Sequence, residues 1–294
     1  MSRSFAGSVS RAVAGSIAMA LVTMLGSSFA WSATMALVID TQGTSSQRSK
    51  ARVELLSELA PGSELQLDAA ARVVLVHTVT GVEYTLYGPG DFRWTNQGAQ
   101  SLRAGGRITT REPLGGALRE VSLRTGRLAQ ASIAMRGEGQ PEPLRLTSPV
   151  ATWLLEMPRE FSWQPGPGAL SYRFELTDSR GTLIHVVESL TETRLTLPPA
   201  LGLEPGRTYA WQVTAHLPTG ARLEGWTEFG VAGDSMRASA SRAQPPADAG
   251  FSDRLLYAAL LDTWGLREQA DGEWRRLASD RPDEQRIRAR AAAQ

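Results

Sequence analysis

Two neighbouring stretches decide the fold class: Ala71–Thr78 reads ARVVLVHT, and Val82–Tyr87 reads VEYTLY. Both alternate and are rich in β-branched residues, which is typical of β-strands. A glycine-containing turn separates them, and a third such stretch, Asp91–Thr95, follows the turn Gly88-Pro89-Gly90. Strand-and-turn units of about 8–12 residues predict a small antiparallel sandwich over residues 35–112.

A longer pattern around these strands resembles a known domain. It runs L-x-P-G-x-x-L-x-L-x-x-x-A-x-V-V-L over Leu59–Leu75 and continues as GVEYTLYGPG over Gly81–Gly90. This is similar to the FecR-type periplasmic domain, and the resemblance implies a run of short strands in an exported protein. We find neither the transmembrane helix nor the cytoplasmic anti-sigma segment of the regulator itself, so signalling to a sigma factor is not implied.

Residues 144–232 predict a second β module. Six or seven short strand patterns include Trp163 early and the run L-x-P-G-x-x-Y-x-W-x-V over Leu203–Val213 late. The set resembles a fibronectin type III sandwich. The resemblance implies that Trp163 is the core tryptophan of the second strand and that Trp211 is structural. It also implies that the Tyr209 hydroxyl bonds to the backbone near Leu203, as in a tyrosine corner.

The other segments are assigned by composition and period. Residues 113–143 are expected to be a connector, 233–250 a flexible linker and 283–294 a fraying tail. Between the last two, the apolar period changes to 3.6 and predicts a helical hairpin over 251–282. We expect Ser252 to cap its first helix and Gly265 to end it.

This hairpin resembles a single tetratricopeptide repeat, and one such unit cannot bury its apolar face alone. The face is therefore expected to dock on the preceding module, on a second copy of the chain or on a partner. Aromatic and aliphatic side chains usually dominate such contacts. The candidate partner-binding residues are Leu256, Leu260, Trp264 and Trp274.

The first thirty residues predict a signal peptide. Arg3 and Arg11 precede the uncharged apolar stretch Ala12–Leu25, and small residues favour cleavage after Ala30. Cleavage after Ser32 fits nearly as well, and an uncleaved membrane anchor is the alternative. The fourteen apolar residues would span only about 21 Å, less than the ~30 Å of a bilayer core. We expect a periplasmic or secreted protein with no membrane span after cleavage.

Composition excludes several function classes. The chain has 294 residues and no cysteine, which excludes disulfides, thiolate nucleophiles and cysteine-held metals. Its 31 Lys+Arg and 30 Asp+Glu give a net charge of +1. Cleavage after Ala30 removes two arginines and no acid, which leaves 29 against 30, so the mature charge is −1. Nothing therefore favours a nucleic-acid partner.

No catalytic, metal or cofactor motif occurs. His77, His185 and His216 stand apart at no metal-ligand spacing, and no nucleophile elbow or phosphate loop is found. We expect no cofactor, no metal and no enzymatic activity. A carboxylate-based hydrolase stays open, because two acids can converge from distant loops.

The leading hypothesis is an exported, non-enzymatic binding or scaffold protein of the bacterial envelope. It would act through protein–protein contacts or self-association, with sensory or regulatory input as one use. The alternative is a cell-wall or polysaccharide-binding protein, in which aromatics of the first module stack on sugars. Alternation favours a core role for these residues over a platform. They are Tyr84, Tyr87, Phe92 and Trp94.

Overall fold

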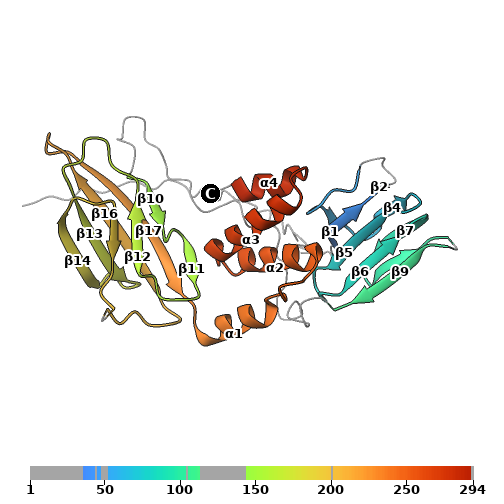
Figure 1. Ribbon diagram of the computed structural model, residues 1–294. Helices are drawn as coiled ribbons and strands as arrows, with labels where there is room; N and C mark the ends of the chain where they lie inside the picture. The colour runs from blue at the N-terminus through green and yellow to red at the C-terminus, as the bar shows by residue number, and fades with distance from the viewer. Residues whose placement is uncertain are drawn as a thin grey trace, which may run out of the picture. The chain divides into compact units, whose positions relative to one another are not determined.

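The computed structural model describes residues 36–43, 45–47, 52–103, 105–112, 144–199 and 201–292. All of these described residues fall in a single unit. The described ranges are mainly β, with several antiparallel sheets and four helices near the C-terminus, so the predicted fold class is confirmed (Figure 1). The predicted signal peptide, residues 1–30, and the connector, residues 113–143, lie outside these ranges.

The first β module consists of two antiparallel sheets. The five-stranded sheet has the order β3-β1-β5-β6-β9, and the four-stranded sheet has the order β2-β4-β7-β8. The strands are β1 (Ala36–Gln42), β2 (Ser45–Gln47), β3 (Glu58–Leu59), β4 (Glu64–Leu67), β5 (Arg72–His77), β6 (Glu83–Tyr87), β7 (Gly90–Thr95), β8 (Gly98–Ser101) and β9 (Arg107–Arg111). The three stretches taken as strands from the sequence are β5, β6 and β7.

A core cluster in this module contains Val38, Val73, Leu75 and Leu86, together with Phe92 and Trp94 of the smaller sheet. Tyr84 meets Trp94 edge to face, with ring centroids 5.4 Å apart. The other face of the larger sheet is also apolar, because Leu37, Ile39, Val74 and Val76 are buried as well. Strands β1 and β5 are thus buried on both faces, which requires a second layer.

The second β module also has two sheets. A three-stranded sheet has the order β10-β12-β15, and a five-stranded sheet has the order β11-β17-β16-β13-β14, in which only β11 and β17 are parallel. The strands are β10 (Leu146–Ser148), β11 (Thr152–Leu154), β12 (Glu160–Trp163), β13 (Ser171–Asp178), β14 (Leu183–Leu190), β15 (Arg194–Thr196), β16 (Thr208–His216) and β17 (Arg222–Val231).

Aromatic rings fill the core of the second module. Phe161 meets Phe174, Trp211 and Phe229 at centroid distances of 5.2, 5.2 and 5.5 Å. Trp163 is 3% exposed, and Trp211 donates through Nε1 to the Pro149 carbonyl at 2.8 Å.

The Tyr209 hydroxyl bonds to the backbone beside Leu203. The Tyr209 hydroxyl accepts from the Glu204 N–H at 2.6 Å. Glu204 directly follows Leu203, so this bond ties the loop before β16 to the sheet.

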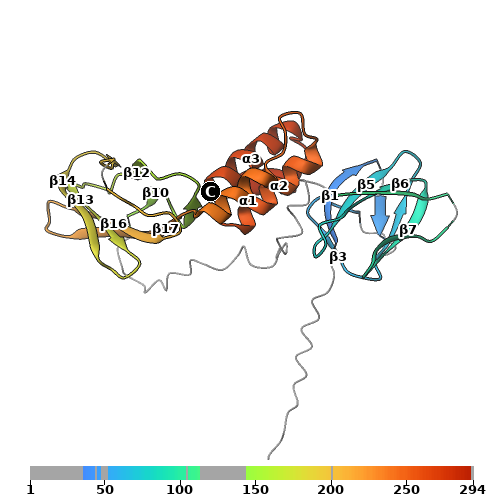
Figure 2. The ribbon, with the colours of Figure 1, turned by 90° about the horizontal axis from the view of Figure 1, so that it is seen from below.

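The helices are α1 (Asp234–Ala243), α2 (Phe251–Thr263), α3 (Arg267–Asp280) and α4 (Gln285–Ala292); Figure 2 shows the first three from a second side. Helices α2 and α3 are the expected hairpin. The expected cap is wrong by two residues, because α2 begins at Phe251 with Gly250 at the N-cap rather than Ser252. Gly265 follows the end of α2 with φ +75°, a conformation that glycine adopts without strain.

The segment expected to be a flexible linker, residues 233–250, contains helix α1. Its small side chains allow close packing, and Ala240 and Ala243 are 2% and 0% exposed. Arg237 also donates through Nε to the Leu155 carbonyl at 3.0 Å. Met236 is the only large apolar residue of α1, so its small and polar composition is that of a linker.

The expected tail, residues 283–294, contains helix α4. Ile287 is fully buried there, and the Arg290 guanidinium forms two hydrogen bonds to the Asp262 carboxylate and one to Asp271 at 3.2 Å. The same Asp262 accepts from Trp274 Nε1 at 2.8 Å. Partly buried ionic contacts with α2 and α3, together with Ile287, therefore hold a segment whose composition alone predicts fraying.

Candidate functional site

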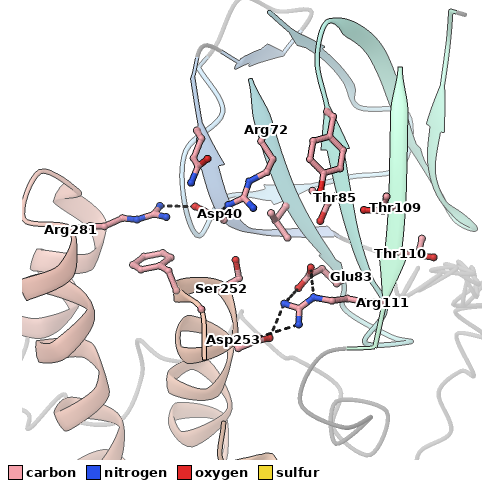
Figure 3. Close-up of a pocket in the computed structure, with 15 residues that line it drawn as sticks. Asp40, Arg72, Glu83, Thr85, Thr109, Thr110, Arg111, Ser252, Asp253 and Arg281 are labelled. Atoms are coloured by element: carbon pink, nitrogen blue, oxygen red, sulfur yellow. Dashed lines mark hydrogen bonds and ion pairs between the residues drawn. The ribbon is translucent and has the colours of Figure 1, made fainter. Parts of the chain in front are cut away.

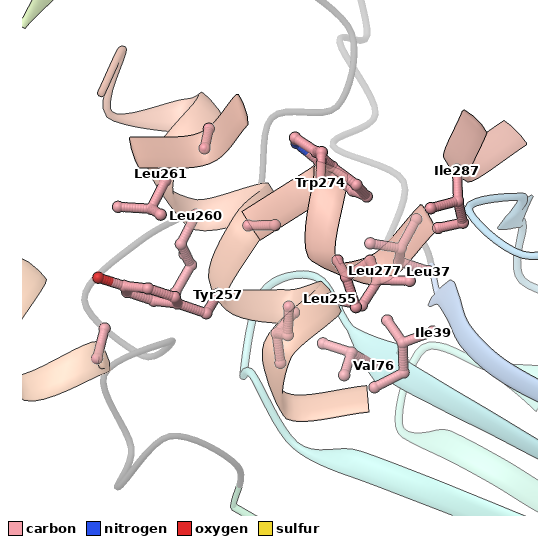
Figure 4. Packing of buried hydrophobic residues seen from close by; sticks show 14 of the residues in the cluster. Leu37, Ile39, Val76, Leu255, Tyr257, Leu260, Leu261, Trp274, Leu277 and Ile287 are labelled. Atoms are coloured by element: carbon pink, nitrogen blue, oxygen red, sulfur yellow. The ribbon is translucent and has the colours of Figure 1, made fainter. Parts of the chain in front are cut away.

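Three of the four residues proposed as partner-binding anchors are buried, and the fourth is half-buried. Leu256 and Leu260 are fully buried, Trp274 is 2% exposed and Trp264 is half-buried. They belong to one apolar cluster that also contains Leu37, Ile39, Leu55, Val74 and Val76 of the first β module (Figure 4). The helical face thus docks within the chain. Leu256, Leu260 and Trp274 are corrected from partner-binding to core residues, and Trp264 packs against them.

The aromatics of the first module do not form a sugar platform either. Phe92 is 0% and Trp94 is 1% exposed, and both lie in the core of the module. Tyr84 donates to the Gln97 carbonyl at 3.2 Å and packs on Trp94, while Arg107 stacks over Tyr87 at 3.9 Å. None of these rings lies beside another on an open face.

A polar cavity of about 450 Å³ lies where the larger sheet of the first module meets α2 and α3 (Figure 3). Its sheet side is lined by charged and hydroxyl side chains of β1, β5, β6 and β9, and its helix side by the start of α2 and by Arg281. The charged residues are Asp40, Arg72, Glu83, Arg111, Asp253 and Arg281.

Asp40 is the most buried charge of the cavity, with its side chain 2% exposed. It forms an ion pair with Arg72 of the neighbouring strand β5 and another with Arg281 at 2.6 Å. The Arg281 guanidinium also lies 3.7 Å from the centroid of the Phe251 ring. One carboxylate therefore links the sheet to the helices.

Arg111 makes a second link of the same kind. Its guanidinium donates to both oxygens of Glu83, each at 2.7 Å, and to both oxygens of Asp253, at 2.8 and 3.2 Å. The bonds to Glu83 raise the pKa of Arg111 most, against the lowering effect of burial. Such bidentate geometry is the strong form of an arginine–carboxylate contact.

The three carboxylates of the cavity are thus partners of three guanidiniums. The pairs Asp40–Arg281 and Arg111–Asp253 therefore form two structural links between the larger sheet and the helices.

The histidines lie apart in the structure as in the sequence. His77 accepts through Nδ1 from the backbone N–H groups of Val79 and Thr80, at 3.3 and 3.1 Å. His185 and His216 lie on β14 and β16. No group of three or more potential metal ligands occurs within the ranges that the structure describes.

One surface that sequence reasoning did not identify is the outer face of β17, β16, β13 and β14. Along β17, Thr227 and Phe229 point into the sandwich, and Glu224, Trp226 and Glu228 point outward. Trp226 is 63% exposed, the highest value among the tryptophans that the structure describes. The signal was the strict alternation of Arg222–Val231, which places this indole on the polar side of the strand.

Comparisons with known proteins add little. No family model matches the chain, and no curated protein matches it. Among solved structures, CopC from Methylosinus trichosporium OB3b is 19% identical, over 30% of this chain and 93% of that protein, with a TM-score of 0.23. In the described part of the chain, no helix is long and apolar enough to cross a membrane.

Proposed function

We propose that this chain is an exported, non-enzymatic binding and scaffold protein of the bacterial envelope. The observation that carries the proposal is that the C-terminal helices bond to both β modules. Toward the first module, Arg281 pairs with Asp40 at 2.6 Å and Asp253 with Arg111 at 2.8 Å. Toward the second, Gly265 accepts from the Trp153 N–H at 2.8 Å.

The same contacts argue against an enzyme. Each charged side chain of the cavity pairs with one of opposite charge. Two of these pairs, Asp40–Arg281 and Arg111–Asp253, hold the helices on the sheet. A joint of this kind supports a multi-module protein that presents its remaining surfaces to a ligand. Those surfaces are the parts of the two sandwiches that the helices do not cover.

We also propose the two family assignments. For the second module, the support is the pair of antiparallel sheets, the buried Trp163 and the bond between the Tyr209 hydroxyl and Glu204. For the first module, it is the run of short strands over the quoted L-x-P-G pattern. Export is supported by Arg3, Arg11 and the apolar stretch that follows them.

Expression of the tagged chain, with cell fractionation and N-terminal sequencing, tests export. We expect the protein in the periplasm or medium, beginning at Trp31 or Ala33. A full-length chain retained in the cytoplasm would overturn this part of the proposal.

Incubation of the purified protein with envelope material tests the absence of catalysis. We expect saturable retention without release of soluble sugar or peptide. Release that persists in wild-type protein and stops in the Glu83→Gln variant would show that the cavity is catalytic.

A further inference from the structure

We propose that the outer face of β17, β16 and β13 binds a neutral glycan, with Trp226 as its stacking platform. The inference rests on the proposed function, since it names the ligand class of an exported binding protein. It places the site on the second β module, far in sequence from the aromatics first considered.

The strand register defines what surrounds the indole. Gln212 of β16 lies directly opposite Trp226, and Glu175 of β13 lies directly opposite Gln212. Neighbouring strands are about 4.8 Å apart, so Gln212, whose amide has one acceptor and two donor positions, is the cross-strand neighbour of Trp226 on this face. On β17 itself, Glu224 and Glu228 lie two residues away on either side and on the same face.

This arrangement suits a sugar ring. One face of a pyranose ring presents C–H groups that pack on an indole, while its hydroxyl groups need donors and acceptors at the rim. Amide and carboxylate side chains supply those groups in binding sites of mixed character. The polar rim of Trp226 consists of such side chains.

The pattern of apolar exposure favours a glycan over a protein partner. The other exposed apolar side chains of this sheet are Leu183 and Val186 on the edge strand β14. Three strand spacings, about 14 Å, separate β14 from β17, and the polar Gln212 and Glu175 lie in the row between them. Trp226 is therefore a single aromatic within a polar surface, not the centre of an extended apolar patch.

The charge of the face selects the kind of glycan. Arg173 is held by Glu175 at 2.8 Å and by Glu188 at 2.7 Å, so its guanidinium is already paired. Glu224 and Glu228 flank the indole with negative charge. Anionic polysaccharides are repelled by such a rim, and neutral ones are not.

The test is calorimetric titration of the full chain with chitohexaose as a neutral probe and with an alginate oligomer as an anionic probe. We expect wild-type protein to bind chitohexaose and not alginate. The Trp226→Ala variant should bind at least about tenfold more weakly, a difference of about 1.4 kcal/mol. Trp226→Phe should keep most of the affinity, because it retains an aromatic face.

Leu170→Ala is the matched control. Leu170 is 64% exposed, as Trp226 is, but its position before β13 gives it the parity of the inward residues Tyr172 and Phe174. It should bind chitohexaose as the wild type does. Unchanged thermal unfolding of all three variants will show that differences in binding do not arise from misfolding.

Three results would overturn the glycan proposal: no binding of chitohexaose by wild-type protein, equal binding by Trp226→Ala, or tighter binding of alginate. The proposed function fails separately. If Trp226→Ala instead weakens retention on envelope proteins, the glycan is wrong and the chain is still a binding protein. If the chain is not exported, the proposed function fails whatever the titration shows.

Discussion

Each of the two β modules contains a five-stranded sheet. The outer face of the first sheet is covered by helices, whereas the outer face of the second is accessible. In the first module, β1 and β5 carry apolar side chains on both faces, and the outer set packs in one cluster with the C-terminal helices. In the second, β13, β16 and β17 alternate between buried and accessible positions, and the outer face keeps an exposed tryptophan. The difference shows that a strand's residue pattern decides whether a sheet acquires a second layer.

The sharpest test of this comparison substitutes one tryptophan in each region: Trp274 in the helices that cover the first sheet, and Trp226 on the exposed face of the second. Trp274→Ala should destabilise the protein by about 3–5 kcal/mol, because it leaves a cavity in the core and removes a donor from the buried Asp262. Trp226→Ala should change stability by less than about 0.5 kcal/mol, because its ring is largely in solvent. Urea denaturation of both variants measures the two values.

Equal losses in the two variants would break the comparison. They would mean that the ring of Trp226 is as engaged as that of Trp274, in spite of an exposed fraction of 63%. A small loss for Trp274→Ala would mean that the helices contribute little to the folded unit.

Helix α4 offers the next test, because it is one of the helices that belong to the cluster on the first sheet. Burial lowers the pKa of Arg290, and its contacts with Asp262 and Asp271 outweigh that effect and raise it. Arg290→Ala should cost about 2 kcal/mol, less than a fully buried pair because the side chain is 24% exposed. Faster amide hydrogen exchange over residues 285–292 should accompany the loss.

Arg288→Ala is the control on the same helix, because Arg288 is exposed. It should change the free energy of unfolding by less than about 0.5 kcal/mol and leave amide hydrogen exchange over this helix unchanged. If Arg290→Ala behaves in the same way, the segment is the fraying tail that composition predicts.

Sequence reasoning reached the fold class because it depends on local signals. The turns around β5, β6 and β7, the tryptophan and tyrosine of the second sandwich and the 3.6-residue period of α2 are all readable within short windows. Helix α1 was missed because its alanines, serines and charged residues, with Met236 as the only large apolar side chain, have the composition of a flexible linker.

The sequence left open docking on the preceding module, on a second copy or on a partner. The structure packs Trp153 and Leu155 of the preceding module against the helices, but it also docks them on the first sheet, which was not among these options. The signal for docking on this sheet is the unbroken apolar run of β1 and β5, which reads as two buried faces rather than one. The ion pairs of the cavity could not be predicted, because Asp40 and Arg281 are 241 residues apart and only the fold brings them together.

The polar part of the covered face is tested by Arg111→Ala. It leaves Glu83, whose side chain is 4% exposed, without its two-pronged partner and removes the link to Asp253. Because Arg111 itself is 48% exposed, we expect a loss of about 1–2 kcal/mol rather than the larger cost of a fully buried pair. Urea denaturation at low and high salt measures it.

Arg111→Lys is the matched variant, since it keeps the charge and loses the planar fork. It should recover about half of the loss, and high salt should reduce the difference between the wild type and Arg111→Ala. An Arg111→Ala protein as stable as wild type at low salt would show that the apolar cluster alone holds the helices on the sheet.

The smallest effect is expected in the second module, in the turn between β13 and β14. The Asp178 carboxylate accepts from the backbone N–H groups of Thr182 and Arg180, at 2.8 and 2.9 Å. The bond from Thr182 lowers the pKa of Asp178 most.

Because the folded pKa of Asp178 lies below the ordinary value of 3.8, the stabilisation is complete well above pH 4 and disappears as the pH falls through the folded value. Asp178→Ala should therefore lower the melting temperature more at pH 7 than at pH 2, while Asp248→Ala, an exposed control, should lower it at neither. A difference between wild type and Asp178→Ala that is as large at pH 2 as at pH 7 would mean that the turn depends on the shape of the side chain and not on its charge.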